Sequence, residues 1–150
     1  MKYASLLFLV VSLFSCSQKK KKKEVEAYPV LETMGYYQRF SQKLWLAGIN
    51  KNWELADFYT HELEEVTEHL IEGDVIHDDY NLSNLTVQML LPKIEKVEEA
   101  IRQKDEVLFL DNYKLMISSC NLCHNTTKHN FIKITTPNDS SIWNQNFSLD

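Results

Sequence analysis

Residues 50–73, NKNWELADFYTHELEEVTEHLIEG, carry the pattern that decides the fold. Asn50 or Asn52 is the expected N-cap, Glu54 falls in the first turn, and Gly73 ends the segment. Apolar residues recur at spacings of three and four, which places them on one face of a helix. They are Ala56, Tyr59, Leu63, Val66 and Leu70. The stretch therefore predicts an amphipathic helix that buries this face against other helices.

The same apolar spacing recurs on both sides of this stretch. Upstream it predicts a helix over residues 31–47, and downstream of a polar loop at residues 74–81 it predicts two more. In the first of these, Pro92 either kinks the helix or marks where a second helical segment begins. The last helix covers residues 105–128. The apolar positions are Met34, Tyr37, Phe40, Leu44 and Trp45 upstream, then Val87, Leu90, Ile94, Val97 and Ile101, and finally Leu110, Tyr113 and Ile117.

Four amphipathic helices joined by short loops predict an all-α fold, an antiparallel four-helix bundle over residues 31–128. The remaining residues 129–150 contain Pro137 and are rich in asparagine and serine. They predict an irregular C-terminal tail that lies over the bundle, with residues 131–134 as a candidate extended piece.

The amino terminus has the pattern of an export signal over residues 1–15. Lys2 precedes an apolar run at residues 6–14, too short for the roughly 20 residues that span a bilayer. The run ends in Leu13-Phe14-Ser15-Cys16, which resembles the lipobox of bacterial lipoproteins. The resemblance implies cleavage before Cys16 and a lipid anchor on its sulfur. The alternative is a soluble secretory signal with an incidental cysteine.

Charge divides the chain into two parts. Residues 19–23 are consecutive lysines, which with the rest of residues 16–30 predict a solvated tether near the membrane. From Glu24 onward there are 10 basic and 21 acidic residues, a net charge of −11. An acidic body argues against nucleic acid as a partner.

The motif that carries chemistry is Cys120-Asn121-Leu122-Cys123-His124, a C-x-x-C-H sequence within the last predicted helix. Positions i, i+3 and i+4 share one helix face. Two thiols at this spacing suit the two vinyl groups along one haem edge, and the following imidazole can then ligate the iron. The motif predicts one covalent haem c, attached outside the cytoplasm, which agrees with an export signal.

Other readings of the motif stay open. A zinc site would need two more ligands, and His129 is the nearest candidate for one of them. A dithiol redox pair usually stands in a βαβ context, which the pattern does not predict here. An incidental match on a helix, or a disulfide between Cys120 and Cys123, would leave a non-haem envelope lipoprotein.

A four-helix bundle with C-x-x-C-H on its last helix resembles cytochrome c′ and its relatives. The stretches KLWLAG at residues 43–48 and NWELA at residues 52–56 are also similar to a small family of envelope c-type cytochromes. The resemblance covers about residues 31–137 and implies haem held by Cys120, Cys123 and His124. It also implies that Lys128, four residues after the histidine, lies near the proximal haem face. The tail after Lys128 departs from the family pattern, in which the last helix finishes the chain.

The resemblance further implies that Met34 lies over the open haem face. As a sixth iron ligand Met34 would suit electron transfer, as a packed cap it would leave iron open to a small gas, and a plain core methionine is the third option. The other histidines, His61, His69 and His77, are expected at the surface. Trp45, Trp53, Tyr59, Tyr37 and Phe40 are expected as core aromatics around the haem.

These observations predict a lipid-anchored monohaem c-type cytochrome of the bacterial envelope. Its expected role is one-electron transfer with a redox partner, or binding of a diatomic ligand such as nitric oxide or carbon monoxide. No catalytic residue stands out, so an enzyme such as a weak peroxidase is the least favoured class. Whether the chain forms a homodimer stays open.

Overall fold

A computed structural model describes residues 28–138. The predicted signal peptide, Cys16, the lysine run and residues 139–150 of the predicted tail lie outside the described residues. Most of the described residues are helical, so the prediction of an all-α fold is confirmed. The elements are α1 (Val30–Ile49), α2 (Trp53–Glu72), β1 (Ile76–His77), β2 (Tyr80–Asn81), α3 (Leu82–Leu85), the π-helix η1 (Thr86–Leu90), α4 (Leu91–Gln103) and α5 (Glu106–Thr126).

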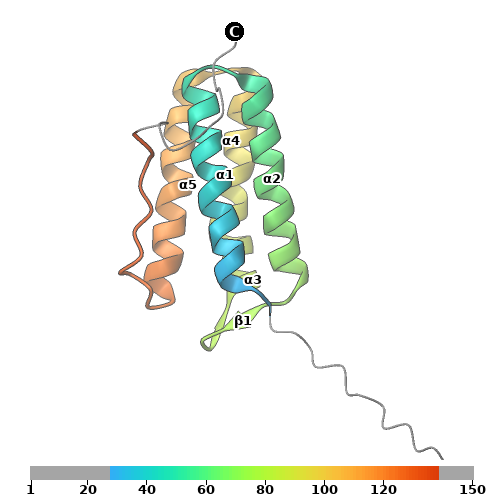
Figure 1. Cartoon of the computed structure of the whole chain (residues 1–150), viewed down its shortest axis with the longest axis vertical. Coiled ribbons are helices and arrows are strands. Elements are labelled where there is room, and N and C mark those ends of the chain that lie inside the picture. The colour runs from blue at the N-terminus through green and yellow to red at the C-terminus, as the bar shows by residue number, and fades with distance from the viewer. Residues whose placement is uncertain (1–27, 139–150) are drawn as a thin grey trace, which may run out of the picture.

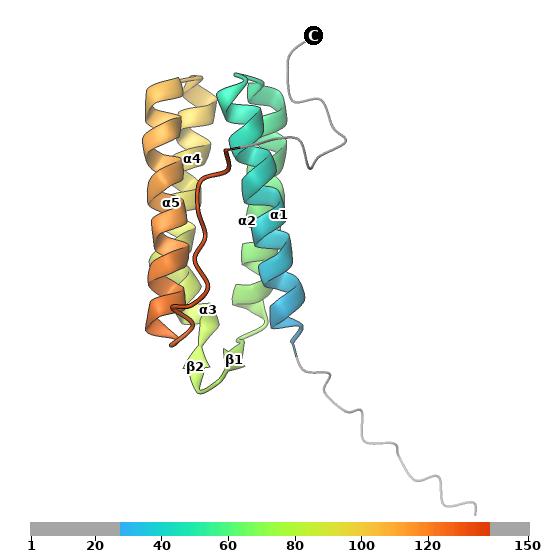
Figure 2. The same ribbon diagram turned by 60° about the vertical axis from the view of Figure 1, so that its left-hand side comes forward.

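The long helices α1, α2, α4 and α5 lie side by side along the long axis of the molecule (Figure 1). The turned view shows α1 next to α2 and α4 next to α5 (Figure 2). We call one end of the helical body the turn end, because short turns join α1 to α2 and α4 to α5 there. The opposite end is the hairpin end, where β1, β2 and α3 lie beside the start of α1 and the end of α5.

Local capping explains where the helices start. The side chain of Asn52 accepts a hydrogen bond from the backbone N–H of Leu55, and that of Asp105 accepts one from Leu108. Both bonds satisfy N–H groups that the first helical turn leaves without a partner. Of the two predicted N-caps of α2, the structure therefore selects Asn52. The helical region starts one residue before the predicted range 31–128, at Val30, and ends two residues before its end, at Thr126.

The predicted loop and third helix differ most from expectation. Residues 74–81 hold a small hairpin, in which Ile76 pairs with Asn81 and His77 with Tyr80. Asp78 and Asp79 form its turn with φ values of 47° and 67°, the left-handed conformation that such two-residue turns require. The next helical stretch is divided into α3, η1 and α4, and Pro92 falls in the first turn of α4. The helical stretch runs without a break from Leu82 to Gln103, and Pro92, which has no N–H to donate, directly follows the wider π-turn that interrupts the regular hydrogen-bond ladder.

Two apolar clusters fill the interior. The main core takes residues from α1, α2, α4 and α5, and the hairpin-end cluster is built around Leu70, Val75 and Leu82. The main core consists of Leu44, Leu46, Ala47, Ala56, Tyr59, Leu63, Ile94, Val97, Ala100, Ile101, Phe109, Tyr113, Met116 and Ile117. No helix within residues 28–138 has both the length and the apolar character that a bilayer crossing demands.

Candidate functional site

The C-x-x-C-H motif lies in the last two turns of α5, at the hairpin end. Cys120, Cys123 and His124 are all half-buried, and both cysteines are free thiols. Their spacing on one continuous helix places the three side chains on a common face, as predicted. The motif therefore presents two thiols and one imidazole together, from a single rigid element.

Burial controls the chemistry of the two thiols. Burial, with a further contribution from neighbouring Cys123, raises the pKa of Cys120 to about 12. Burial also raises the pKa of Cys123. Both groups are therefore protonated at neutral pH, and a protonated thiol is a poor nucleophile.

Tyr37 of α1 lies in the surroundings of these thiols. Its hydroxyl donates a hydrogen bond of 3.0 Å to Thr67 Oγ1 on α2. Burial is the main cause that raises the pKa of Tyr37, the bond to Thr67 opposes it, and Tyr28, Cys120 and Cys123 add to the rise. This influence brings α1 into the neighbourhood of the motif, and the haem-lining role of Tyr37 stays a prediction.

The His124 ring is held in one orientation by the backbone. Its Nδ1 lies 3.1 Å from the carbonyl oxygen of Ile132. A carbonyl oxygen only accepts hydrogen bonds, so Nδ1 must carry the ring proton. Nε2 is then the nitrogen with a free lone pair, the form that binds a metal.

Beyond α5 the chain turns back along the helix (Figures 1 and 2). We call residues 129–138 the C-terminal strap. The side chain of Asn121, the second residue of the motif, donates from Nδ2 to the carbonyl of Ile134 and accepts from the Ile134 N–H, both at 2.8 Å. The strap confirms an irregular tail for residues 129–138.

The two further residues predicted for the haem site lie at the hairpin end. Met34 is half-buried and packs against the hairpin-end cluster. Lys128 is exposed and lies two residues after the end of α5, in the left-handed conformation with a φ of 63°. Neither position tests a role toward haem, and both roles stay predictions.

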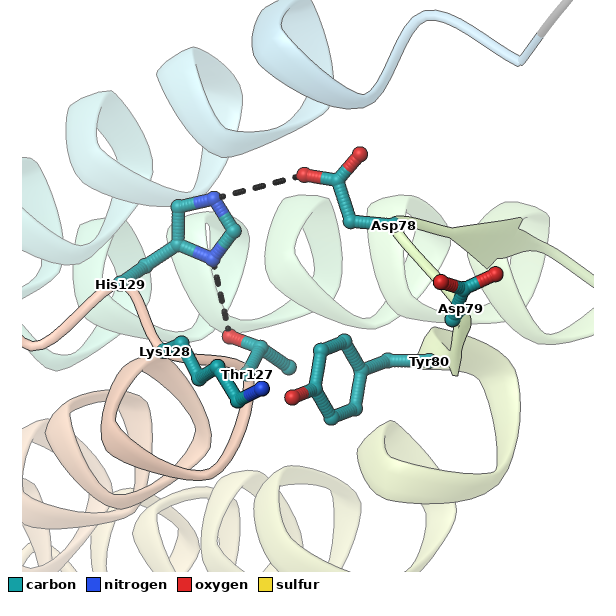
Figure 3. A pocket seen from close by; sticks show the side chains of 6 residues that line it. All are labelled: Asp78, Asp79, Tyr80, Thr127, Lys128 and His129. Atoms are coloured by element: carbon teal, nitrogen blue, oxygen red, sulfur yellow. Dashed lines mark hydrogen bonds and ion pairs between the residues drawn. The ribbon is translucent and has the colours of Figure 1, made fainter.

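A surface pocket of about 360 Å³ opens next to the end of α5. In it, His129 lies between Asp78 of the hairpin turn and Thr127, with Nε2 3.7 Å from the carboxylate and Nδ1 3.2 Å from the hydroxyl (Figure 3). The remaining lining residues are Asp79, Tyr80 and Lys128. The ion pair between Asp78 and His129 links the hairpin to the first residue of the strap.

The other aromatic and histidine predictions divide by location. His61, His69 and His77 are exposed, as predicted. Trp45 and Trp53 pack against Phe109, near the start of α5. Phe109 and Cys120 are about 16 Å apart along the helix, at 1.5 Å per residue. The two tryptophans therefore lie toward the turn end of α5, and their expected place around the haem stays a prediction.

A lone metal ion and a haem iron need different numbers of protein ligands. Within residues 28–138, no three side chains among His, Cys, Asp and Glu gather in a way that could hold a metal ion. A haem iron brings four porphyrin nitrogens and needs one or two protein ligands. The motif fits that requirement, because it supplies two thiols for the porphyrin and an imidazole whose Nε2 is free.

Sequence reasoning did not identify the residues that position His124. Two of them, Ile132 and Ile134, act through backbone groups that every residue type has. The third, Asn121, occupies a position of the motif where any residue is allowed, so no residue pattern predicts its role. Comparisons of the chain with protein-family models, curated proteins and solved structures found no match. The inference on function therefore rests on these residues and their geometry.

Proposed function

We propose that this chain is a monohaem c-type cytochrome of the bacterial envelope, anchored by a lipid on Cys16. In this proposal α1, α2, α4 and α5 form an antiparallel four-helix bundle like that of cytochrome c′. The protein transfers single electrons or binds a diatomic gas. One observation carries the proposal: Cys120, Cys123 and His124 share one helix face, and His124 Nδ1 faces the carbonyl oxygen of Ile132, which leaves Nε2 as the nitrogen for a metal.

The three residues of the motif would bind the haem in two different ways. Cys120 and Cys123 would form thioethers with the haem, and His124 would be an axial ligand through Nε2. When bound, the haem supplies an iron that changes its oxidation state by one electron or takes up a small ligand. The carbonyl of Ile132 keeps the His124 ring in the required tautomer.

The neighbouring residues would set the surroundings of the haem. Tyr37 contributes a partly buried hydroxyl that is already bonded to Thr67, and the main core keeps water from one side of α5. Met34 is the proposed residue over the open face, as a sixth ligand or as a cap. Lys128, exposed beside the end of α5, is the proposed basic residue of the proximal side.

The chemistry of the thiols bears on one rival, a reactive redox dithiol. Such a pair works through a lowered thiol pKa. Burial raises the pKa of both cysteines instead. A thioether is neutral at every pH, so this buried environment suits haem attachment better than a reactive thiolate.

An absorption spectrum tests the proposal. The full chain, produced with the machinery that attaches haem c, should carry a Soret band that stays with the protein after denaturation. A Cys120→Ser, Cys123→Ser double variant should lose it, and Ser118→Ala, an exposed change on the same helix, should keep it. A folded helical protein with no covalent chromophore would overturn the proposal.

Carbon monoxide separates the two roles. Added to the reduced protein, it should change the spectrum strongly and quickly if the sixth position is open, which supports gas binding. A silent spectrum supports a sixth protein ligand and electron transfer. The anchor is tested separately, by incorporation of labelled fatty acid in the wild type and its loss in Cys16→Ser.

A further inference from the structure

The C-terminal strap has no helix or strand, yet it is fixed at two points. At its far point the Asn121 side chain makes two hydrogen bonds to one residue, Ile134. The amide group of asparagine is planar and offers a donor and an acceptor side by side. Two bonds from such a group to the N–H and C=O of one residue define both its position and its orientation.

At its near point the strap continues from the end of α5. The His129 N–H donates to the carbonyl of His124 at 2.6 Å, and the Ile132 N–H donates to the carbonyl of His129 at 2.9 Å. The ion pair between His129 and Asp78 ties this point to the hairpin as well. Ile132 lies between the two anchor points, so its carbonyl oxygen is held 3.1 Å from His124 Nδ1.

We propose that the strap is a positioning device, in which Asn121 clamps Ile134 and thereby holds the Ile132 carbonyl against His124, fixing the tautomer and orientation of that ring. The effect of the strap on the His124 ring requires no bound haem. The effect on iron rests on the proposed function.

The physical consequence follows from what an imidazole does when its second nitrogen is bonded. A hydrogen bond from Nδ1–H to a carbonyl selects the tautomer, orients the ring and makes Nε2 a stronger donor to a metal. A stronger donor stabilises the oxidised iron over the reduced iron, so the clamp lowers the reduction potential. Asn121 is therefore a positioning residue, because it acts through the strap rather than by touching the group.

The chain offers a matched pair of variants. Asn121→Ala removes both bonds to Ile134. Asn125→Ala makes the same change one turn further along α5, at an exposed position. Each replaces an asparagine with a better helix former, so a general effect on the helix would be shared by both.

The first measurement uses the full chain produced without haem attachment. Amide hydrogen exchange should be slow at Ile134 in the wild type and in Asn125→Ala, and fast in Asn121→Ala. Nitrogen NMR of His124 should report the Nδ1-protonated tautomer in the first two proteins and a shift toward the Nε2-protonated tautomer in Asn121→Ala. Unchanged exchange at Ile134, or an unchanged tautomer once the clamp is lost, would overturn the proposal.

The second measurement uses the haem-loaded protein. The midpoint potential should rise in Asn121→Ala and stay at the wild-type value in Asn125→Ala. Equal potentials in all three proteins would overturn the effect on iron. If the chain takes up no haem but the tautomer responds to Asn121→Ala, the positioning role of the strap is supported while the proposed function fails.

Discussion

The two ends of α5 are built on different principles. At the turn end, Phe109 is fully buried at 0% exposure and meets Trp45, Trp53 and Tyr113 ring to ring. At the hairpin end, Leu122 is 53% exposed, and the residues beside it hold the strap through hydrogen bonds. One helix therefore packs by apolar area at its start and by polar bonds at its end.

The difference separates stability from chemistry. Apolar burial is non-directional and supplies most of the free energy of folding. Polar bonds add less net free energy but fix directions. The motif stands where direction matters, because an imidazole must present one particular nitrogen. We therefore expect changes at the turn end to act on the free energy of unfolding, and changes at the hairpin end to act on the site.

Phe109→Ala should have the largest effect on stability. Truncating a fully buried phenylalanine removes apolar contacts and leaves a cavity, at a cost of about 3–5 kcal/mol. Urea denaturation followed by circular dichroism measures it. Leu115→Ala, at a half-exposed position of the same helix, should change the free energy of unfolding by about 0.5 kcal/mol or less. Similar losses in both variants would contradict the claim that apolar burial at Phe109 stabilises the turn end.

Gly48→Ala tests how closely the turn end is packed. A Cβ added to Gly48 would overlap the ring of Phe109. Such overpacking should cost about 1–3 kcal/mol. Gly35→Ala, also on α1 but in open space, should stabilise the protein by about 0.5–1 kcal/mol because alanine is the better helix former. Effects of equal sign in the two variants would show that Phe109 yields and that the contact is loose.

Helix positions were predictable because the signals that set them are local. Asn52 and Asp105 bond to N–H groups three residues away, and Gly73 is the C-cap of α2. The arrangement of Cys120 and Cys123 with His124 follows from helix periodicity in the same way. On α5 the predicted face was incomplete: Phe109 and Met116 are buried as well, since α5 packs against more than one neighbour.

The parts that sequence could not predict depend on distant backbone groups. Asn121 meets Ile134 across 13 residues, through atoms that every residue type shares. The hairpin turn uses two aspartates at positive φ, where asparagine or glycine would have given a clearer signal. The position of Met34 depends on how Leu70, Val75 and Leu82 come together, and no spacing along the chain reveals that.

Met34→Ala probes the hairpin end. The contrast between the two ends of α5 predicts a small loss in the free energy of unfolding there and a change in the properties of the haem site. Met34 is only half-buried, so truncation should cost about 1 kcal/mol. If Met34 ligates the iron, the haem-loaded variant changes its spectrum and spin state. If it is a cap, the spin state is unchanged and carbon monoxide binds faster. An unchanged spectrum with unchanged gas binding would show a plain core residue.

Tyr37 and Tyr113 make the finest comparison, because they are phenols in different settings. Tyr37 is partly buried and donates to the side chain of Thr67, whereas Tyr113 is fully buried and donates to the Ser41 carbonyl at 2.9 Å beside Trp45. At pH 7 each Tyr→Phe change removes one hydrogen bond and should cost about 0.5–1.5 kcal/mol. Cys120 contributes to the raised pKa of both phenols, so both changes should also shift the spectrum of the haem-loaded protein.

The cost of the two tyrosine changes should vary with pH in the same way. Burial is the main cause that raises the pKa of both Tyr37 and Tyr113 above the ordinary 10.0. Above pH 10 the unfolded chain loses these protons and the folded chain keeps them, so each tyrosine lowers stability by about 1.4 kcal/mol per pH unit. A phenylalanine variant does not undergo this loss at the substituted position. The difference in free energy of unfolding between the wild type and the variant should therefore vanish about one pH unit above 10. Urea denaturation from pH 8 to 12 measures this, and a deficit that stays constant would show that the phenol titrates as it does in water.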